Sequence, residues 1–228
     1  MTRRPWVGLL GGTFDPVHNG HLALARAAHQ ALALDRVRFI PAARPPHRPD
    51  SPRASEYHRL EMLRRALDGC AGWEVCDLEL HRDGPSYSFD TLAAFHREGL
   101  SPLQLFFLTG TDAFAEIATW HRYPDVLDSA HFAVITRPGF SLSVLQARLP
   151  ALADRMIEPA GVADSATPRI VLIEAHTPNV SSTDIRRLAS RGESLKDLVP
   201  PAVAAYISEK RLYRKPADAF GEGGPSGS

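Results

Sequence analysis

Short apolar runs alternate with helix-forming segments along most of the 228-residue chain. The run Trp6–Leu10 ends in glycines, as a buried strand of a parallel sheet does, and the Ala- and Leu-rich segment 21–34 contains no helix breaker. The alternation continues with strands expected at 37–42, 73–80, 103–110, 131–139 (strand, then turn) and 169–175, and helices expected at 56–69, 88–99, 112–120, 141–149, 182–192 and 201–213. This pattern predicts an α/β, Rossmann-like fold: a mostly parallel, twisted sheet with helices on both faces.

The length of the chain suits one domain, which we predict to span residues 1–215. Residues 216–228 are rich in Gly, Ser and Pro and contain few apolar side chains, so we predict a disordered tail. The segment 44–55 contains four prolines, which oppose regular structure and predict a long exposed loop.

The balance of charges argues against several classes of partner. Lys and Arg total 26, and so do Asp and Glu, so the chain has no overall attraction to nucleic acid or to an anionic membrane. The apolar run after the N-terminal arginines is too short for a signal segment, and no run is long enough to span a membrane. We therefore expect a cytoplasmic protein with no nucleic-acid or membrane partner. Cys70 and Cys76 are too few for a disulfide framework and are predicted to be reduced thiols.

The loop between the first predicted strand and helix contains two glycines and two histidines. Gly11 and Gly12 allow a sharp turn and a close approach of a ligand to the backbone, and the amides of the following helix start suit a phosphate. His18 and His21 are three residues apart and can face one ligand. Neither the P-loop nor the dinucleotide fingerprint is present, because no Gly-Lys-Ser/Thr follows and the third glycine is misplaced.

Three interpretations of the histidines compete. They are surface groups, they are metal ligands, or they donate hydrogen bonds to nucleotide phosphates. The metal interpretation is weakened because no acidic or thiol partner lies nearby in the sequence, and we predict no resident metal ion.

The stretch "GGTFDPVHNGHL" resembles the signature of the class I nucleotidyltransferase superfamily, whose members transfer a nucleotidyl group to a phosphate. The resemblance implies that His18 and His21 contact the triphosphate and are catalytic, His21 being the more consistently required. It also implies that an ATP-binding loop is formed by Gly11, Gly12, Thr13 and Phe14.

The segment "NVSSTDIRR" taken alone predicts a helix capped by Ser182, with Asp184 near the helix dipole. It also resembles a second superfamily element, whose Ser/Thr pair and arginine bind the ATP phosphates. Ser182, Thr183 and Arg186 take those places, and Arg186 is predicted to be catalytic. By the same resemblance, Arg137 in "VITRPG" is assigned a minor role near the nucleotide.

Two further motifs resemble those of bacterial nicotinate-nucleotide adenylyltransferases. The basic residue of "PPHR", Arg48, corresponds to one that approaches the phosphates. In "DLELHRDGPSYSFDTL" the residues alone predict a strand, a turn and a helix capped by Ser88. The resemblance implies that Ser86, Tyr87 and Ser88 bind the substrate and that the backbone at Tyr87 and Ser88 receives a pyridine carboxylate. Backbone amides at a helix start favour an acid over an amide.

The segment "FFLTGTDAFAEIATWHRY" is similar to the same family's Gly-Ala-Asp motif with a downstream tryptophan, and Thr111 replaces the alanine. Gly110 and Asp112 are then expected at the nucleotide. Trp120, which could equally be a core residue, is expected to stack on the pyridine ring.

Taken together, the resemblances imply adenylyl transfer from ATP to nicotinate mononucleotide, giving deamido-NAD and pyrophosphate, with Mg²⁺ arriving with ATP. Rival hypotheses are a transferase for nicotinamide mononucleotide or another phosphorylated acceptor, a non-catalytic nucleotide-binding module and a histidine metalloprotein. The oligomeric state stays open.

Overall fold

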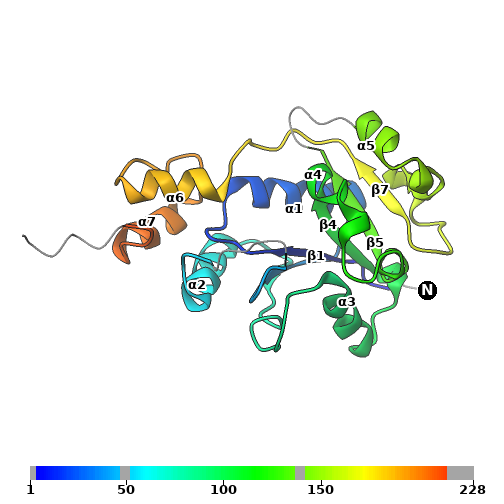
Figure 1. The fold of residues 1–228 in the computed structure, drawn as a ribbon, viewed down its shortest axis with the longest axis horizontal. Coiled ribbons are helices and arrows are strands. Elements are labelled where there is room, and N and C mark those ends of the chain that lie inside the picture. Colours follow the sequence, from blue (N-terminus) through cyan, green and yellow to red (C-terminus); the bar gives the residue numbers. More distant parts are fainter. Residues whose placement is uncertain (1–3, 47–51, 137–141, 215–228) are drawn as a thin grey trace, which may run out of the picture.

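The computed structural model describes residues 4–46, 52–136 and 142–214, which form a layered α/β structure around one parallel sheet (Figure 1). The predicted tail 216–228 and the turn at 137–139 lie outside the described residues. The strands are β1 (Val7–Gly12), β2 (Arg36–Pro41), β3 (Trp73–Val75), β4 (Leu105–Gly110), β5 (His131–Ile135), β6 (Met156–Ile157) and β7 (Ile170–Ile173). The α-helices are α1 (Asn19–Leu32), α2 (Glu56–Leu67), α3 (Ser88–Arg97), α4 (Thr111–Phe114), α5 (Leu142–Arg148), α6 (Ser182–Ser190) and α7 (Pro201–Glu209).

The sheet has seven strands in the order β3-β2-β1-β4-β5-β7-β6. Each adjacent pair is parallel, so the predicted Rossmann-like architecture is confirmed and the sheet is fully rather than mostly parallel. The strand order reverses between β1 and β4, which are hydrogen-bonded neighbours. A crevice at such a switch point, beyond the carboxyl ends of the strands, is where sheets of this kind bind ligands.

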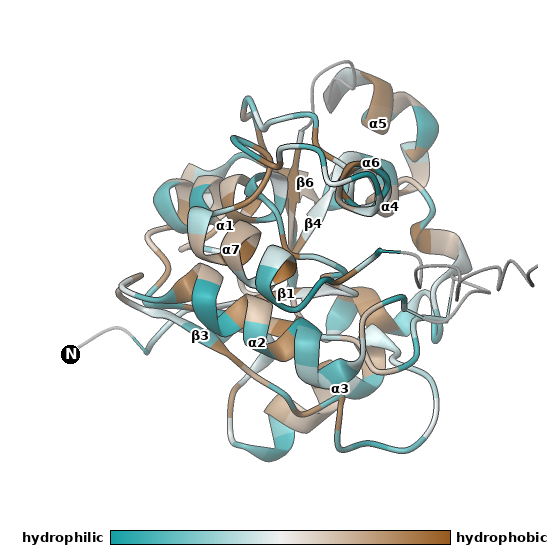
Figure 2. Cartoon of the chain, turned by 90° about the vertical axis from the view of Figure 1, so that its left-hand side faces the viewer, coloured by the Kyte–Doolittle hydropathy of each residue, from teal (hydrophilic) through white to brown (hydrophobic). Residues whose placement is uncertain are grey.

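Alternation along the central strands separates two apolar cores, one on each face of the sheet. Leu9 and Phe107 join one core with α3, α4 and α5, whereas Leu10 and Phe106 join the other with α1, α2, α6 and α7. Figure 1 shows α1 on one side of the sheet and α3 on the other. In Figure 2 teal and brown segments alternate along the helices, as expected for helices with one face on the sheet and one in solvent.

The strand predicted at 73–80 is wrong beyond Val75. The last hydrogen bond of its ladder runs from the Cys76 amide to the Phe39 carbonyl, although β2 continues to Pro41. The chain then turns, with the Leu80 amide donating to the Asp77 carbonyl at 2.9 Å. This turn brings Glu79 into the interior, although the alternation of the sequence resembles a strand.

The helix predicted at 112–120 is wrong beyond Phe114. α4 ends there, and a 3₁₀ turn at Ile117–Thr119 follows. The Thr119 hydroxyl and amide both donate to the Glu116 carbonyl, at 2.8 and 2.9 Å, within this turn. The backbone is extended at Trp120 (φ −72°, ψ 146°), directly after it.

The remaining predicted strands and helices are found with ends displaced by a few residues, and the two-residue strand β6 was not predicted. Among the described residues, none of the helices has the length and apolar character needed to cross a membrane. Cys70 and Cys76 are free thiols, as predicted.

Candidate active site

A cleft of about 690 Å³ opens at the carboxyl ends of β1, β2 and β4. The ends of these strands form its floor, and the segments around α3 and α4 form its walls. Its lining includes residues predicted for both halves of the site: Gly11, Gly12, Thr13, His21, Ser86, Tyr87, Ser88, Gly110, Asp112 and Trp120. It also includes residues that were not predicted, among them Glu79, Thr91, Glu116 and His121.

The loop after β1 turns at a different place from the one expected. Gly11 and Gly12 remain in the strand, and the left-handed residue is Phe14, with φ 49°. The Phe14 ring folds back beneath the strand end, where a Cβ on Gly12 would lie 3.1 Å from it. Gly12 is therefore required for the close packing of the buried Phe14 ring, and the sharp turn predicted at the glycines is wrong.

His18 and His21 hold one another at the start of α1. The His18 amide donates to Nδ1 of His21 and the His21 amide donates to Nδ1 of His18, both at 3.3 Å. The two rings are stacked with centroids 3.6 Å apart, and His18 is buried beneath His21, which lines the cleft. Because each Nδ1 accepts a hydrogen bond, a neutral ring carries its proton on Nε2, which makes Nε2 a donor.

Gly20 explains why the two histidines can share this arrangement. A Cβ at Gly20 would lie 3.0 Å from Nδ1 of His18 and 3.4 Å from the Pro178 carbonyl oxygen. A residue with a side chain at position 20 would therefore push on the His18 imidazole, which caps α1.

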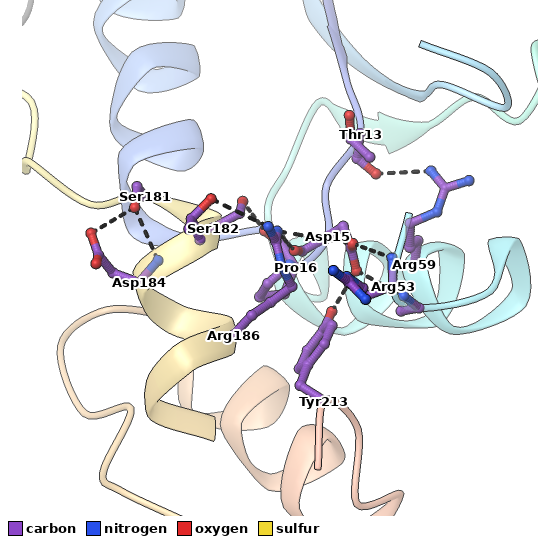
Figure 3. A network of polar contacts seen from close by, with 12 residues as sticks. Thr13, Asp15, Pro16, Arg53, Arg59, Ser181, Ser182, Asp184, Arg186 and Tyr213 are labelled. Carbon is purple, nitrogen blue, oxygen red and sulfur yellow. Dashed lines mark hydrogen bonds and ion pairs between the residues drawn. The ribbon is translucent and has the colours of Figure 1, made fainter. Parts of the chain in front are cut away.

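The buried carboxylate of Asp15 anchors the same loop (Figure 3). It accepts hydrogen bonds from the amides of Arg53, at 2.7 Å, and Ala54, at 3.1 Å, and from the hydroxyl of Tyr213, at 2.9 Å. Burial and the neighbouring carboxylate raise the pKa of Tyr213, so its phenol keeps the proton that it donates. The Tyr213 hydroxyl thus attaches the C-terminal part of the described chain to the loop that follows β1.

Arg59, on α2, supports this loop from beneath. Its side chain is fully buried, and its Nη1 donates to the carbonyls of Thr13, at 2.8 Å, and Ala42, at 2.7 Å. Burial lowers the pKa of Arg59, and the negative charge of Asp15 opposes that shift. One guanidinium therefore joins the ends of β1 and β2 on the floor of the cleft.

The start of α6 lies against the same loop. Ser181, rather than Ser182, caps this helix by accepting from the Asp184 amide at 3.1 Å, so the predicted cap is wrong by one residue. The Ser182 hydroxyl donates to the Pro16 carbonyl at 3.1 Å (Figure 3).

Arg186 holds the loop by a second bond from α6. Its Nη1 donates to the Asp15 carbonyl at 2.8 Å, and its Nη2 donates to the Thr183 hydroxyl at 3.2 Å. Ser182, Thr183 and Arg186 thus meet the histidine loop without lining the cleft itself.

The opposite wall of the cleft is formed by the start of α3. Tyr87 occupies the N-cap position without a side-chain cap, so the cap predicted at Ser88 is wrong. The Tyr87 ring stacks on His121, with centroids 4.2 Å apart. The Ser86 hydroxyl accepts from the amides of Ala43, at 3.0 Å, and Arg44, at 3.2 Å, and so ties this wall to the segment after β2.

Trp120 is both a packing residue and a cleft residue. Its half-buried ring makes edge contacts with Phe107 and Phe132, at centroid distances of 5.6 and 6.1 Å, and it also lines the cleft. The sequence left open whether Trp120 is a core residue or a ring that stacks on a ligand. Its position is compatible with both.

Comparison with known sequences places this arrangement in a family. The sequence profile of the cytidylyltransferase-like family matches residues 9–188. A protein of Moorella thermoacetica named "probable nicotinate-nucleotide adenylyltransferase" is 41% identical over 224 residues, covering 98% of this chain and 99% of the relative. One of the same name from Pseudomonas syringae pv. tomato is 42% identical over 210 residues, covering 92% and 94%. The chain belongs to the nicotinate-nucleotide adenylyltransferase family.

Solved structures agree at the level of the fold. The Plasmodium falciparum nicotinic acid mononucleotide adenylyltransferase, solved with APC and with NaAD, aligns with TM-scores of 0.66 and 0.67 at 16% and 15% identity. Both alignments cover 92% of this chain and 98% of the parasite chain.

The site predicted from the family resemblance is brought together in large part. His18 and Phe14 are buried and do not line the cleft, and Ser182 and Arg186 of α6 bond the loop after β1 without lining it. Arg48 and Arg137 lie outside the described residues. Sequence reasoning missed Asp15, Arg59 and Glu79, because an isolated charged residue carries no sign of burial.

Proposed function

We propose that this chain transfers the adenylyl group of ATP to nicotinate mononucleotide, forming deamido-NAD and pyrophosphate. One observation carries the proposal. A single cleft joins the histidine loop at one end to the uncapped start of α3 and the Trp120 ring at the other. The dinucleotide product contains an adenylyl part derived from ATP and a pyridine part. The histidine end of the cleft suits the first, and the end formed by α3 and Trp120 suits the second.

In this reaction a phosphate oxygen of nicotinate mononucleotide attacks the α-phosphorus of ATP. The new P–O bond forms as the bond to the bridging oxygen of the β-phosphate breaks, and pyrophosphate leaves. The attacking phosphate is already an anion, so alignment and charge stabilisation supply the catalysis. We assign Nε2–H of His21 as the donor to the developing charge and His18 as the group that orients it.

ATP is expected to arrive with Mg²⁺, whose bound charge would neutralise phosphate oxygens. In the part of the chain that the structure describes, no cluster of three or more His, Cys, Asp and Glu side chains suits a metal ion. We therefore treat the ion as part of the substrate. We propose separately that the reaction takes place in the cytoplasm.

Selection of the acid rests on the start of α3. The amides of the first helical turn have no partner within the helix, and the positive end of the helix dipole favours a carboxylate. A carboxamide at the same place gains less, because it carries no charge. We propose that the pyridine ring lies against Trp120 with its carboxylate toward Tyr87 and Ser88.

The test is pyrophosphate release from ATP with a panel of acceptors: the mononucleotides of nicotinate and nicotinamide, and phosphopantetheine. We expect the highest kcat/KM with nicotinate mononucleotide, with deamido-NAD identified by mass. Equal rates with acid and amide would contradict the role of α3, and no release with any acceptor would contradict the enzyme.

A further inference from the structure

Glu79 is a buried carboxylate on the cleft wall to which the proposed reaction gives no role. It is 5% exposed and lies on the turn that follows β3. Burial raises its pKa, and hydrogen bonds from Thr91 and Ser86, together with the charge of Arg82, act in the opposite direction. A buried acid on the wall of a site for an anionic substrate needs a reason, because its charge repels that substrate.

The hydroxyls that approach Glu79 belong to the wall proposed to recognise the acid. Thr91, in the first turn of α3, donates to Oε1 of Glu79 at 2.5 Å, and Ser86 precedes the N-cap residue Tyr87. The two hydroxyls therefore bracket the turn that carries the amides of Tyr87 and Ser88. Glu79 holds the Thr91 side of this turn directly, and Ser86 ties the other side to Ala43 and Arg44.

The hydroxyls around Glu79 have partners on several sides. The Ser86 oxygen accepts from the amides of Ala43 and Arg44, and its hydroxyl acts to lower the pKa of Glu79. The Thr91 oxygen accepts from Nη1 of Arg82 at 3.4 Å, and its proton lies within reach of Oε1 of Glu79, at 2.5 Å, and of the Tyr87 carbonyl, at 3.2 Å. The shorter contact makes Glu79 the main acceptor of the Thr91 hydroxyl.

We propose that Glu79 is a positioning residue for acid recognition, which acts by holding the Ser86–Thr91 turn at the edge of the cleft. The proposal rests on the proposed function and names a determinant of its selectivity. A glutamine at this position is neutral, so it would accept from the Thr91 hydroxyl more weakly than the carboxylate does. The turn would then be held less firmly on its Glu79 side.

The decisive variant is Glu79→Gln, assayed for KM with each substrate separately. We expect the KM for nicotinate mononucleotide to rise about tenfold, the typical effect of losing a hydrogen bond to a charged group. The acid-to-amide ratio of kcat/KM should fall about tenfold, whereas the KM for ATP should change less than about twofold, because the histidine loop is untouched.

Electrostatic repulsion alone predicts that the acceptor KM falls in Glu79→Gln rather than rises, so the experiment distinguishes the two effects. Removing a negative charge from the cleft wall should tighten binding of an anionic acceptor. Glu116→Gln measures that charge effect, because Glu116 lines the same cleft and its nearest cation, Nη2 of Arg148, is 3.7 Å away. We expect Glu116→Gln to leave the acceptor KM unchanged or lower. A lowered or unchanged KM in Glu79→Gln would overturn the proposal.

Thr91 supplies a test that does not depend on Glu79→Gln folding. Thr91→Val removes the hydroxyl at constant shape, and Thr91→Ser retains it. We expect Thr91→Val to raise the acceptor KM about fivefold and Thr91→Ser to restore it to within about twofold of the parent. Equal KM values for the two variants would overturn the proposal, as would an equal rise for ATP.

The unmodified protein separates the two levels of inference. If it releases no pyrophosphate with nicotinate mononucleotide, the proposed function fails and the positioning role fails with it. If it turns this acceptor over while Glu79→Gln and Thr91→Val behave like the parent, only the positioning role fails.

Discussion

The two ends of the cleft are built in different ways. At the end proposed for the ATP phosphates, the glycines and histidines lie on one continuous segment, from Gly11 to His21, whose backbone is held by the buried charges of Asp15 and Arg59. At the end proposed for the pyridine ring, the lining comes from the separate segments 79–91 and 120–121, held by ring stacking and hydroxyl bonds.

The difference separates chemistry from selectivity. A continuous, tightly held loop keeps catalytic donors at fixed positions, which electrostatic stabilisation of a transition state requires. A wall assembled from separate segments can change its acceptor without disturbing those donors. Substitutions at the phosphate end should therefore change kcat for every acceptor, and those at the pyridine end should change KM for one substrate.

The largest effect is expected for His21→Ala. Loss of its Nε2–H donor should lower kcat about 10³-fold with nicotinate and nicotinamide mononucleotides alike, while KM for the acceptor stays within about threefold. Stopped assays of pyrophosphate release with each acceptor measure the ratio of kcat in the variant to kcat in the parent. His81→Ala is the control, since His81 is exposed and forms an ion pair with the nearby Asp77 at 3.3 Å. A kcat loss confined to one acceptor would break the division between the two ends.

Arg59→Leu should have the next largest effect, because it leaves the buried carbonyl of Ala42 and the part-buried carbonyl of Thr13 without their donor. We expect the free energy of unfolding to fall by about 3 kcal/mol and kcat to fall for all acceptors. Urea denaturation of the variant and of Arg64→Leu, an exposed arginine on the same helix, gives the comparison. A stability loss without any change in kcat would show that the loop does not need this support.

Trp120→Ala tests the pyridine end. We expect the KM for nicotinate mononucleotide to rise about thirtyfold and the KM for ATP to stay nearly constant, because stacking on an aromatic ring contributes about 2 kcal/mol. Trp120→Phe should recover part of the KM, and melting temperatures separate this effect from lost packing on Phe107 and Phe132. An equal rise in both KM values would assign Trp120 to the core alone.

The same contrast explains how far the sequence could be interpreted. The alternating pattern predicted the parallel sheet, because strand and helix periods are local properties of the chain. The histidine loop could be located for the same reason, since its chemistry is concentrated in eleven residues, Gly11–His21.

What could not be predicted depends on contacts between distant residues. Tyr213 reaches Asp15 across 198 positions, and nothing near either residue indicates the pairing. Glu79 lies where alternation favoured a strand, but β3 ends at Val75 and the chain turns at Asp77–Leu80. Trp120 likewise lies beyond a helix that ends at Phe114 and a 3₁₀ turn that follows it.

Thr111 should give the smallest effect, at the point where the two ends meet. Its hydroxyl is fully buried and has no hydrogen-bond partner within the described residues. Thr111→Val removes that polar group at constant shape, so we expect the free energy of unfolding to rise by about 1 kcal/mol while both KM values stay within about twofold. Thr109→Val is the matched control, since its hydroxyl donates to the Gly110 carbonyl at 3.4 Å and its loss should lower stability slightly. If both variants lost stability in urea, the Thr111 hydroxyl would have to find a hydrogen-bond partner in solution. The junction between the two ends of the cleft would then be polar rather than dry.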